Sequence, residues 1–459
     1  FRIAMLLLGL GMLLATGQQA AAAVIPKPAA KDAQTPPTLA ALGLPSAAAP
    51  QQPARATPLP ATPAREITLS QAVALALAFN PALRAAAMAV PEAQANQITA
   101  SLRPNPVFTW DALFVPYFSP GKFNASTVNS FSEFDALVGY TFERGGKRKR
   151  RIQAAQEVTA VTRSNVADAR RLLRFAAAQQ FIGVLLAKST LAFARRDLAS
   201  FDQTIKVSEA RYAAGQISQG DLLQIQLQRL QFQTDVSSAR LALVQARAAL
   251  RAAVGYRALA PDFQVLGHLR FQPLRGNADD YRALALKNRP DLLAAEQGQT
   301  AAKGQYLLAK ANGKRNLTTT FGYTRVGGLN TGSLTFNMEI PIFDRNQGNI
   351  ASAADGQVQA QDQYRAVRQQ VLTDVATAYH AARTGAQVVQ LYQSGYLKQA
   401  LESRNISSYA YQHGAVSLLD FLNAERDYRQ TELAYRQALA AYMLSRQQLM
   451  ETAGTRSLP

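Results

Sequence analysis

The most constraining feature of this sequence is an internal duplication. The stretch from Arg211 to Gly255 returns 199 residues later without a gap, the separation of Tyr212 from Tyr411. The other matching pairs are Gly215 with Gly414, Ser218 with Ser417, Asp221 with Asp420, Leu250 with Leu449 and Gly255 with Gly454. A register kept over this length indicates that a whole structural unit is repeated. We therefore expect two related halves.

Each half is predicted to open with two helices. In the first half, Thr68 or Ser70 can cap a helix that Asn80-Pro81 ends, and a second helix runs from about 82 to 102. The second half opens alike at Tyr281, breaks at Arg289-Pro290 and continues as a helix to about 310.

Two strand-like segments follow in each half, at about 105–116, 132–143, 316–326 and 332–343. Apolar and polar residues alternate along them over about ten residues, the length of a tilted membrane-spanning strand. Two soluble hairpins are the alternative. Lipid does not tolerate unpaired strand edges, and a closed barrel needs at least about eight strands. Four strands per chain therefore require several chains, with two giving eight strands and three giving twelve.

The longest predicted helices are 146–212 and 348–411, which contain neither proline nor a cluster of helix breakers. Each would be roughly 100 Å long. A glycine turn and a second helix follow each of them, at 218–253 and 417–453. Leu191, Leu198 and Ile205 recur every seven residues, as in a coiled coil. We expect a first repeat at 66–255, a linker at 256–278 and a second repeat at 279–454.

The N-terminal region predicts export from the cytoplasm. Arg2, an apolar run and small residues to Ala23 are typical of a signal peptide at 1–23, and residues 24–65 form a Pro/Ala-rich segment expected to be a flexible linker. We expect a secreted or outer-envelope protein without a transmembrane helix. The net charge is +19, but the basic residues are spread singly and not interleaved with aromatic residues, so we expect no nucleic-acid partner.

No pattern of residues indicates catalysis or a cofactor. His268, His380 and His413 are widely spaced without neighbouring carboxylates, and the sequence has no cysteine, so we expect no metal site. Ser, His and Asp show no nucleophile-elbow spacing, and Gly145-Gly146-Lys147-Arg148 lacks the spacing of a phosphate loop. The chain is predicted not to be an enzyme.

A basic cluster stands where the second strand meets the first long helix. Its members are Lys147, Arg148, Lys149, Arg150 and Arg151. We expect contact with lipid headgroups at the membrane rim, with a solvated helix start as the alternative.

Several strings resemble one family. Phe142–Arg148 resembles the Glu-x-Gly-Gly-Lys-Arg element of the heavy-metal (CzcC-like) branch of the TolC family of outer-membrane efflux ducts. Ile340–Ile350 is similar to the second-strand exit of that branch, and Leu102–Pro106 to its first-strand entry. The resemblance covers about Glu66 to Gly454. It implies a mainly α fold with a small β part, in which a homotrimer closes a 12-stranded barrel in the outer membrane and continues as an α-helical tunnel in the periplasm of a Gram-negative-type envelope.

The resemblance also implies a function and partners. The expected function is a passive exit duct in a tripartite system with a periplasmic adaptor (membrane fusion) protein and an inner-membrane pump, carrying heavy-metal cations. Export of drugs, organic compounds or secreted products is an alternative within the same class. A periplasmic coiled-coil adaptor is an alternative from another class, although adaptors usually carry one hairpin and a lipoyl-like module.

The same resemblance assigns roles to the duplicated turns. The adaptor would contact Gly215, Gln216, Ile217, Ser218, Gly414, Ala415, Val416 and Ser417. The periplasmic entrance would be gated at Asp420, Asp221, Tyr411 and Asn423. Asp420 would form a ring of three carboxylates, and Tyr411 and Asp221 match positions that hold the entrance closed. The chain departs from the family pattern at Asn423, where a second acidic ring would stand, and at Val416, where a linking arginine would stand.

Overall fold

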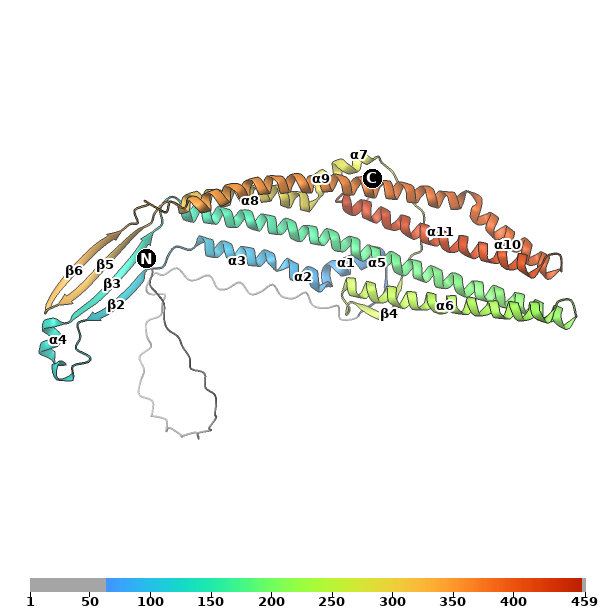
Figure 1. The fold of residues 1–459 in the computed structure, drawn as a ribbon, viewed down its shortest axis with the longest axis horizontal. Coiled ribbons are helices and arrows are strands. Elements are labelled where there is room, and N and C mark those ends of the chain that lie inside the picture. The colour runs from blue at the N-terminus through green and yellow to red at the C-terminus, as the bar shows by residue number, and fades with distance from the viewer. Residues whose placement is uncertain (1–62, 456–459) are drawn as a thin grey trace, which may run out of the picture. The chain divides into compact units, whose positions relative to one another are not determined.

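The computed structural model describes residues 63–455. The predicted signal peptide (1–23) lies outside the described residues, as does the predicted linker (24–65) except for its last three residues. Order begins before the expected boundary at 66, because strand β1 (Ala64–Ile67) pairs with a distant segment. The fold is mostly helical with a small β part, which confirms the predicted class (Figure 1).

The first half opens with helices α1 (Leu69–Phe79), α2 (Pro81–Ala87) and α3 (Ala89–Ser101). Thr68 caps α1 in a capping box with Gln71. The single helix predicted at 82–102 is wrong, because it divides at Met88. Pro91 has no N–H to donate to the carbonyl of Ala87, and its ring crowds that carbonyl.

The second half opens with α7 (Ala278–Asn288) and α8 (Pro290–Asn312). Asn277 caps α7 through the backbone N–H groups of Asp279 and Asp280. Proline occurs in α8 only at its first position, so α8 continues where α2 and α3 are separate.

The larger sheet contains β2 (Val107–Leu113), β3 (Glu133–Phe142), β5 (Leu317–Val326) and β6 (Leu329–Asn337). The order is β2-β3-β5-β6, all antiparallel, so the hairpins of the two halves lie side by side (Figure 1). Gly327 and Gly328, both with positive φ, make the two-residue turn between β5 and β6. The 3₁₀ turn η2 (Pro120–Lys122) and helix α4 (Ala125–Phe131) lie between β2 and β3.

Strand β6 is shorter than the predicted strand at 332–343. It begins at Leu329 and ends at Asn337, which pairs with Thr318. Strand β5 begins at Leu317, so the residues after Met338 have no strand within the chain to continue the ladder.

The two faces of this sheet differ in polarity. Phe108, Val138, Phe321 and Leu334 lie in one cross-strand row, and each is at least 48% exposed. A row on the opposite face contains Asp111, Asp135, Thr324 and Thr331. The sheet therefore presents one apolar and one polar face, with unpaired edges at β2 and β6.

Two helical hairpins dominate the rest of the fold. The first consists of α5 (Lys147–Ala213) and α6 (Gln219–Val254). In the second, α9 (Gln347–Leu391) leads through a π-helical turn, η3 (Tyr392–Tyr396), into α10 (Leu397–Gln412) and then α11 (Leu418–Thr452). The unbroken helix predicted at 348–411 is therefore wrong. Gly395 has φ +144°, a backbone conformation that glycine adopts readily because it has no Cβ. This conformation interrupts the helix.

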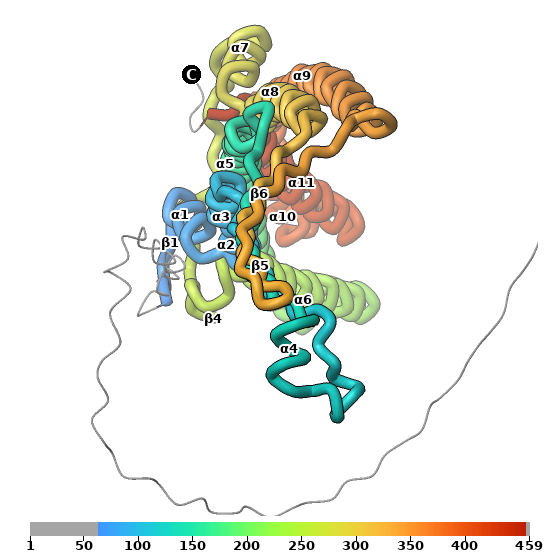
Figure 2. Tube along the Cα trace, turned by 90° about the vertical axis from the view of Figure 1, so that its left-hand side faces the viewer, coloured from blue at the N-terminus to red at the C-terminus, as the bar shows by residue number. Residues whose placement is uncertain are grey.

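The predicted linker at 256–278 contains a strand, β4 (Leu259–Val265), which the sequence interpretation missed. It pairs with β1 in parallel and buries Leu259, Phe263 and Val265. Beside β1 and β4, α1 covers the middle of α5 (Figure 1), and these elements share one apolar core with Phe181 and Leu185. Figure 2 shows β1, α1 and β4 together on one side of the molecule. Pro261 is tolerated because it is exposed and lies in an edge strand, where the register with β1 is irregular.

Within residues 63–455, one helix has an 18-residue window long and apolar enough to cross a membrane, namely α5. In this fold 44% of that window is buried. The segments Leu69–Phe79 and Pro81–Ser101 pass the same test only when taken together across a 50° bend.

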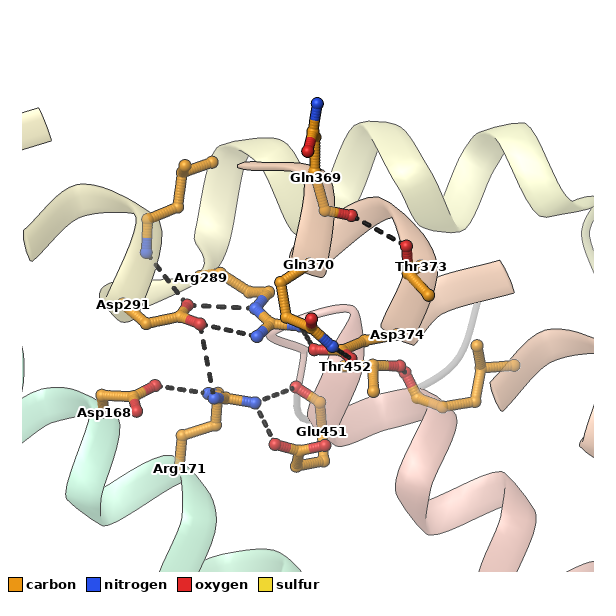
Figure 3. A network of polar contacts seen from close by, with 12 residues as sticks. Asp168, Arg171, Arg289, Asp291, Gln369, Gln370, Thr373, Asp374, Glu451 and Thr452 are labelled. Atoms are coloured by element: carbon orange, nitrogen blue, oxygen red, sulfur yellow. Dashed lines mark hydrogen bonds and ion pairs between the residues drawn. The ribbon is translucent and has the colours of Figure 1, made fainter. Parts of the chain in front are cut away.

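A buried ionic network joins the two halves (Figure 3). Arg289, before α8, donates to Asp291 at 2.6 Å and to Asp374 of α9 at 2.9 Å. Arg171 of α5 pairs with Glu451 of α11, and the side chains of both arginines are less than a tenth exposed. Burial opposes ionisation of Asp291, but the hydrogen bonds and charge of Arg289 outweigh it and hold the pKa of Asp291 below its usual value.

Candidate functional site

The two inter-helix turns have the same geometry. Gly215 and Gly414 adopt left-handed φ values of +72° and +78°. In each turn, the backbone N–H of the residue after the glycine donates a hydrogen bond of 2.8 Å to the carbonyl five residues earlier. The bonds run from Gln216 to Arg211 and from Ala415 to Ala410. This is the hydrogen-bond pattern that ends a helix at a left-handed glycine. The predicted tip residues form these turns and are exposed, except that Ile217 and Val416 are half-buried.

Both duplicated aspartates close capping boxes. The Oδ2 atom of Asp221 accepts from the Ser218 hydroxyl at 2.8 Å, and the Asp221 N–H donates to Ser218 Oγ at 3.0 Å. Asp420 makes the same pair with Ser417, at 2.7 and 3.2 Å. Both aspartates therefore begin their helices whatever else they do.

Tyr411 lies in the core between the two hairpins. It is 3% exposed, its ring stacks on Phe421 with centroids 5.2 Å apart, and its hydroxyl lies 3.4 Å from Ser208 Oγ of α5. Asp221 hydrogen-bonds to Ser218 instead. Among the described residues of one chain, the structure does not bring Tyr411 and Asp221 together.

The fourth predicted gate residue, Asn423, is in contact with a basic side chain. Asn423 accepts a hydrogen bond from Arg426 Nη2 at 3.1 Å, one turn further along α11. Arg426 is also exposed beside Asp427. The part of α11 where a second acidic ring was expected thus carries a cation next to an amide.

Sequence interpretation missed Arg211. Its guanidinium crosses from α5 to donate to the backbone carbonyl of Tyr411 and lies 5.2 Å from the centre of the Tyr411 ring. The duplication held a signal, because the residue that matches Arg211 in the second copy is Ala410. Arg211 is therefore a link that only the first hairpin can supply.

Most side chains of the basic cluster at the start of α5 make hydrogen bonds within the chain. Arg151 donates to the carbonyls of Ala100 and Leu102, and Arg148 to that of Ser101. These carbonyls are the unpaired C-terminal groups of α3, for which arginine is a suitable partner.

The other members of the cluster divide in the same way. Lys147 donates to Asn316 at 2.8 Å and Arg150 to Gln153 at 2.9 Å, whereas Lys149 is exposed. Arg151 also pairs with Glu143, and this hydrogen bond, against the effect of burial, holds the pKa of Glu143 below its usual value.

Metal ligands do not gather in the described chain. Within residues 63–455, no group of three or more His, Asp or Glu side chains could hold a metal ion.

The fold has an amphipathic four-stranded sheet at one end of the long helices and two hairpin tips at the other, an arrangement that suits a membrane channel protein (Figure 1). Comparison with known proteins agrees. The sequence profile of the family described as "Outer membrane efflux protein" matches residues 72–256 and 282–455. The chain belongs to this family. It is an outer-membrane efflux channel protein and not an enzyme, as predicted.

Two relatives with described functions are each about a quarter identical to this chain. The cobalt-zinc-cadmium resistance protein CzcC of Cupriavidus metallidurans is 27% identical over 381 residues, covering 82% of this chain and 87% of CzcC. The cation efflux system protein CusC of Escherichia coli K12 is 26% identical over 316 residues, covering 66% of this chain and 68% of CusC.

Solved structures share the fold. A membrane protein from Pseudomonas aeruginosa superposes with a TM-score of 0.71 at 21% identity, covering 84% of this chain and 92% of the other. A CusC structure gives 0.70 at 21% identity, with coverage of 89% and 99%.

Proposed function

We propose that this chain is the outer-membrane duct of a tripartite efflux system that exports heavy-metal cations. The observation that carries the proposal is the family match over both halves, together with the similarity to CzcC along 82% of the chain. CzcC is described as a cobalt-zinc-cadmium resistance protein and CusC as a cation efflux protein. An inner-membrane pump would supply the substrate through a periplasmic adaptor, and the duct would conduct it passively.

Three copies would form the duct. The open edges at β2 and β6 support assembly, because pairing β6 of one copy with β2 of the next closes a barrel, of twelve strands for three copies. An apolar row that includes Phe108 and Phe321 supports a lipid-facing exterior. The α6 helix leaves a stripe of apolar residues at least 52% exposed, which suits packing against a neighbouring copy: Leu223, Leu227, Leu230, Leu241 and Val244.

The predicted sites take their roles in this assembly. The glycine turns would contact the adaptor, and Asp420, exposed on the first turn of α11, would face the lumen as a ring of three carboxylates. Asp221, Tyr411 and Asn423 would contribute to closing the same entrance. Exposed Lys149 and its basic neighbours would face anionic headgroups at the periplasmic rim. Such a duct carries cations by weak, transient contacts rather than by strong ligands.

Assembly and substrate are tested separately. In detergent, the purified protein should run as a trimer by light scattering and form channels in planar bilayers. A monomer without conductance would contradict the duct.

For the substrate, a strain lacking this gene should lose tolerance to cobalt, zinc or cadmium while keeping tolerance to dyes and antibiotics. The wild-type gene should restore it. Loss of tolerance to dyes and antibiotics alone would assign the duct to organic compounds instead.

A further inference from the structure

Partway along the hairpins, buried charged side chains connect their helices. Asp197 of α5 is 5% exposed, and Arg429 Nε of α11 lies 2.8 Å from its Oδ2 atom. The other end of the Arg429 guanidinium pairs with Asp235 of α6. One arginine of the second hairpin therefore holds both helices of the first.

A second arginine of the same hairpin links its own two helices to α5. Arg404 of α10 donates from Nε to Glu425 Oε2 of α11 at 2.8 Å, and from Nη2 to Ser200 Oγ of α5 at 2.5 Å. Glu425 is 3% exposed. The Arg404 guanidinium lies over the ring of Tyr428 of α11, and its Cζ atom is 5.4 Å from the centre of that ring. All four hairpin helices thus contribute to one charged cluster.

The cluster has one acidic group too many. It contains the carboxyl groups of Asp197, Glu425 and Asp235 but only the guanidinium groups of Arg404 and Arg429. Asp197 and Glu425 are both almost fully buried, and the charge of Glu425 disfavours ionisation of Asp197, so a proton on Asp197 balances the charge of the cluster. Glu425 Oε1 is buried and has no hydrogen-bond donor among the described residues, and a proton carried by Asp197 would supply one.

The proton is held near neutral pH and has a route to solvent. Burial and the charge of Glu425 raise the pKa of Asp197 to about 7, against the opposing effect of Arg429 and Arg404. A cavity of about 310 Å³ is lined by Asp197, Asp235 and Arg429 together with Phe193 and Phe232.

At the level of this cluster the second hairpin has a break in its helix, whereas the first does not. Gly395, within η3, matches Arg196 at the spacing of the duplication, and Arg196 is the residue before Asp197. At the matching level α5 is an unbroken helix. Arg404 and Glu425 lie in the second hairpin between this break and the hairpin tip.

We propose that Asp197 and Glu425 share one proton and act as a proton-operated latch between the two hairpins. With the proton in place, the cluster is charge-balanced and α10–α11 is held against α5–α6. Loss of the proton leaves an extra buried negative charge, which loosens the contact and lets α10–α11 swing about η3. The latch therefore closes below about pH 7 and opens as the pH rises through that value. Its effect on conduction rests on the proposed duct function; the hairpin movement does not.

The movement is measured with spin labels on the assembled protein. The chain has no cysteine, so K206C on α5 and S403C on α10, both at exposed positions, take one label each. Labelled chains are diluted with unlabelled ones so that the distance within one chain dominates. Double electron–electron resonance from pH 5.5 to 8.5 should show the distance lengthening, with a midpoint near pH 7.

Three variants identify the groups responsible. D197N imitates the protonated acid and should keep the short distance throughout the pH range. E425Q removes the second partner of the shared proton and should also abolish the transition. D202N is the matched control, because Asp202 lies five residues further on in α5 and pairs with Arg229 at a half-exposed position. It should keep the wild-type transition. A wild-type distance that ignores pH, or a D197N transition with its midpoint still near 7, would overturn the latch.

Conductance separates the latch from the duct. In planar bilayers, the wild type should conduct more above pH 7, whereas D197N should stay at its low-pH value. A pH-dependent distance without conductance in any variant would support the latch and contradict the proposed duct. Conductance with a pH-independent distance would support the duct and overturn the latch.

Discussion

Asp221 and Asp420 show how one residue can satisfy a helix and a site at the same time. Each closes a capping box with the serine three residues earlier, so helix initiation alone accounts for their duplication. The surroundings of the two turns differ, because Arg211 reaches from the first turn to Tyr411 in the second and Ala410 cannot return the contact. A functional difference between the two aspartates must therefore come from the surroundings of each turn and not from the turn itself.

Replacing Asp420 by alanine should raise single-channel conductance and weaken block by divalent cations. The substitution removes three carboxylates from the proposed ring. It also breaks the capping box by removing the partner of the Ser417 N-cap, which costs about 0.3–1.5 kcal/mol. The matched control is Asp280→Ala, which removes the same capping position from α7, where Asp280 Oδ2 accepts from the Asn277 N–H at 3.0 Å. Equal conductance in wild type and Asp420→Ala, or equal changes in both variants, would remove Asp420 from the entrance.

At the scale of elements, glycine decides where helices end and bend. Gly215 and Gly414 end their helices in left-handed turns, and Gly395 interrupts the second hairpin. Gly183 lies inside α5, where no such conformation is required. The same residue type therefore has opposite effects on stability, according to the backbone it occupies.

Gly215→Ala and Gly183→Ala should change stability in opposite directions. Nothing lies within 4 Å of a Cβ added at either position, so backbone conformation decides the sign. At Gly215 (φ +72°) alanine should destabilise the fold by about 1 kcal/mol. At Gly183 it should stabilise the helix by about 0.5–1 kcal/mol. Thermal unfolding followed by circular dichroism checks both; a fall in Tm for Gly183→Ala would contradict this account.

At the scale of the whole molecule, ionic links hold the duplicated halves together. The Arg289 network connects the start of α8 to α9, and Arg171 connects α5 to α11. The Asp197 cluster ties the hairpins nearer their tips. Removing one partner of such a buried link leaves an uncompensated charge and is costly, whereas exposed pairs contribute little.

Arg289→Ala should destabilise the protein by about 3–5 kcal/mol, because it leaves Asp291 and Asp374 without their partner. Arg282→Ala is the control. It removes an exposed pair with Asp279 and should change the free energy of unfolding by less than about 0.5 kcal/mol. Urea titrations of both variants provide the measurement, and equal losses would contradict a buried link.

The same substitution should alter acid stability. Since the folded-state pKa of Asp291 is lowered, its contribution is fully present above the ordinary aspartate pKa and is lost as the pH falls through the folded value. Without Arg289, only the charge of Arg171, 3.9 Å away, and the Leu292 N–H still favour ionisation of Asp291 against the effect of burial. The stabilising contribution then falls, and unfolding on acidification should begin at a higher pH than in the wild type.

By itself the sequence determined the two halves, the hairpin turns and the alternation of the strands. These follow from signals between near neighbours, such as the glycines at 215 and 414, the serine caps and the period-two pattern in β5 and β6. It also carried the strings that placed the chain in its family. The tip residues could be predicted for the same reason, because a turn is a local structure.

The tertiary structure alone decided the features that need a distant partner. Strand β4 exists because β1 pairs with it, and β6 ends where β5 offers no further partner. Arg211 and Tyr411 meet only when the two hairpins pack together. Asp197 and Glu425 stand 228 positions apart in the chain, unremarkable there as single acidic residues. Packing buries both among the arginines Arg404 and Arg429, and this burial, with the charge of Glu425, raises the pKa of Asp197 to about 7.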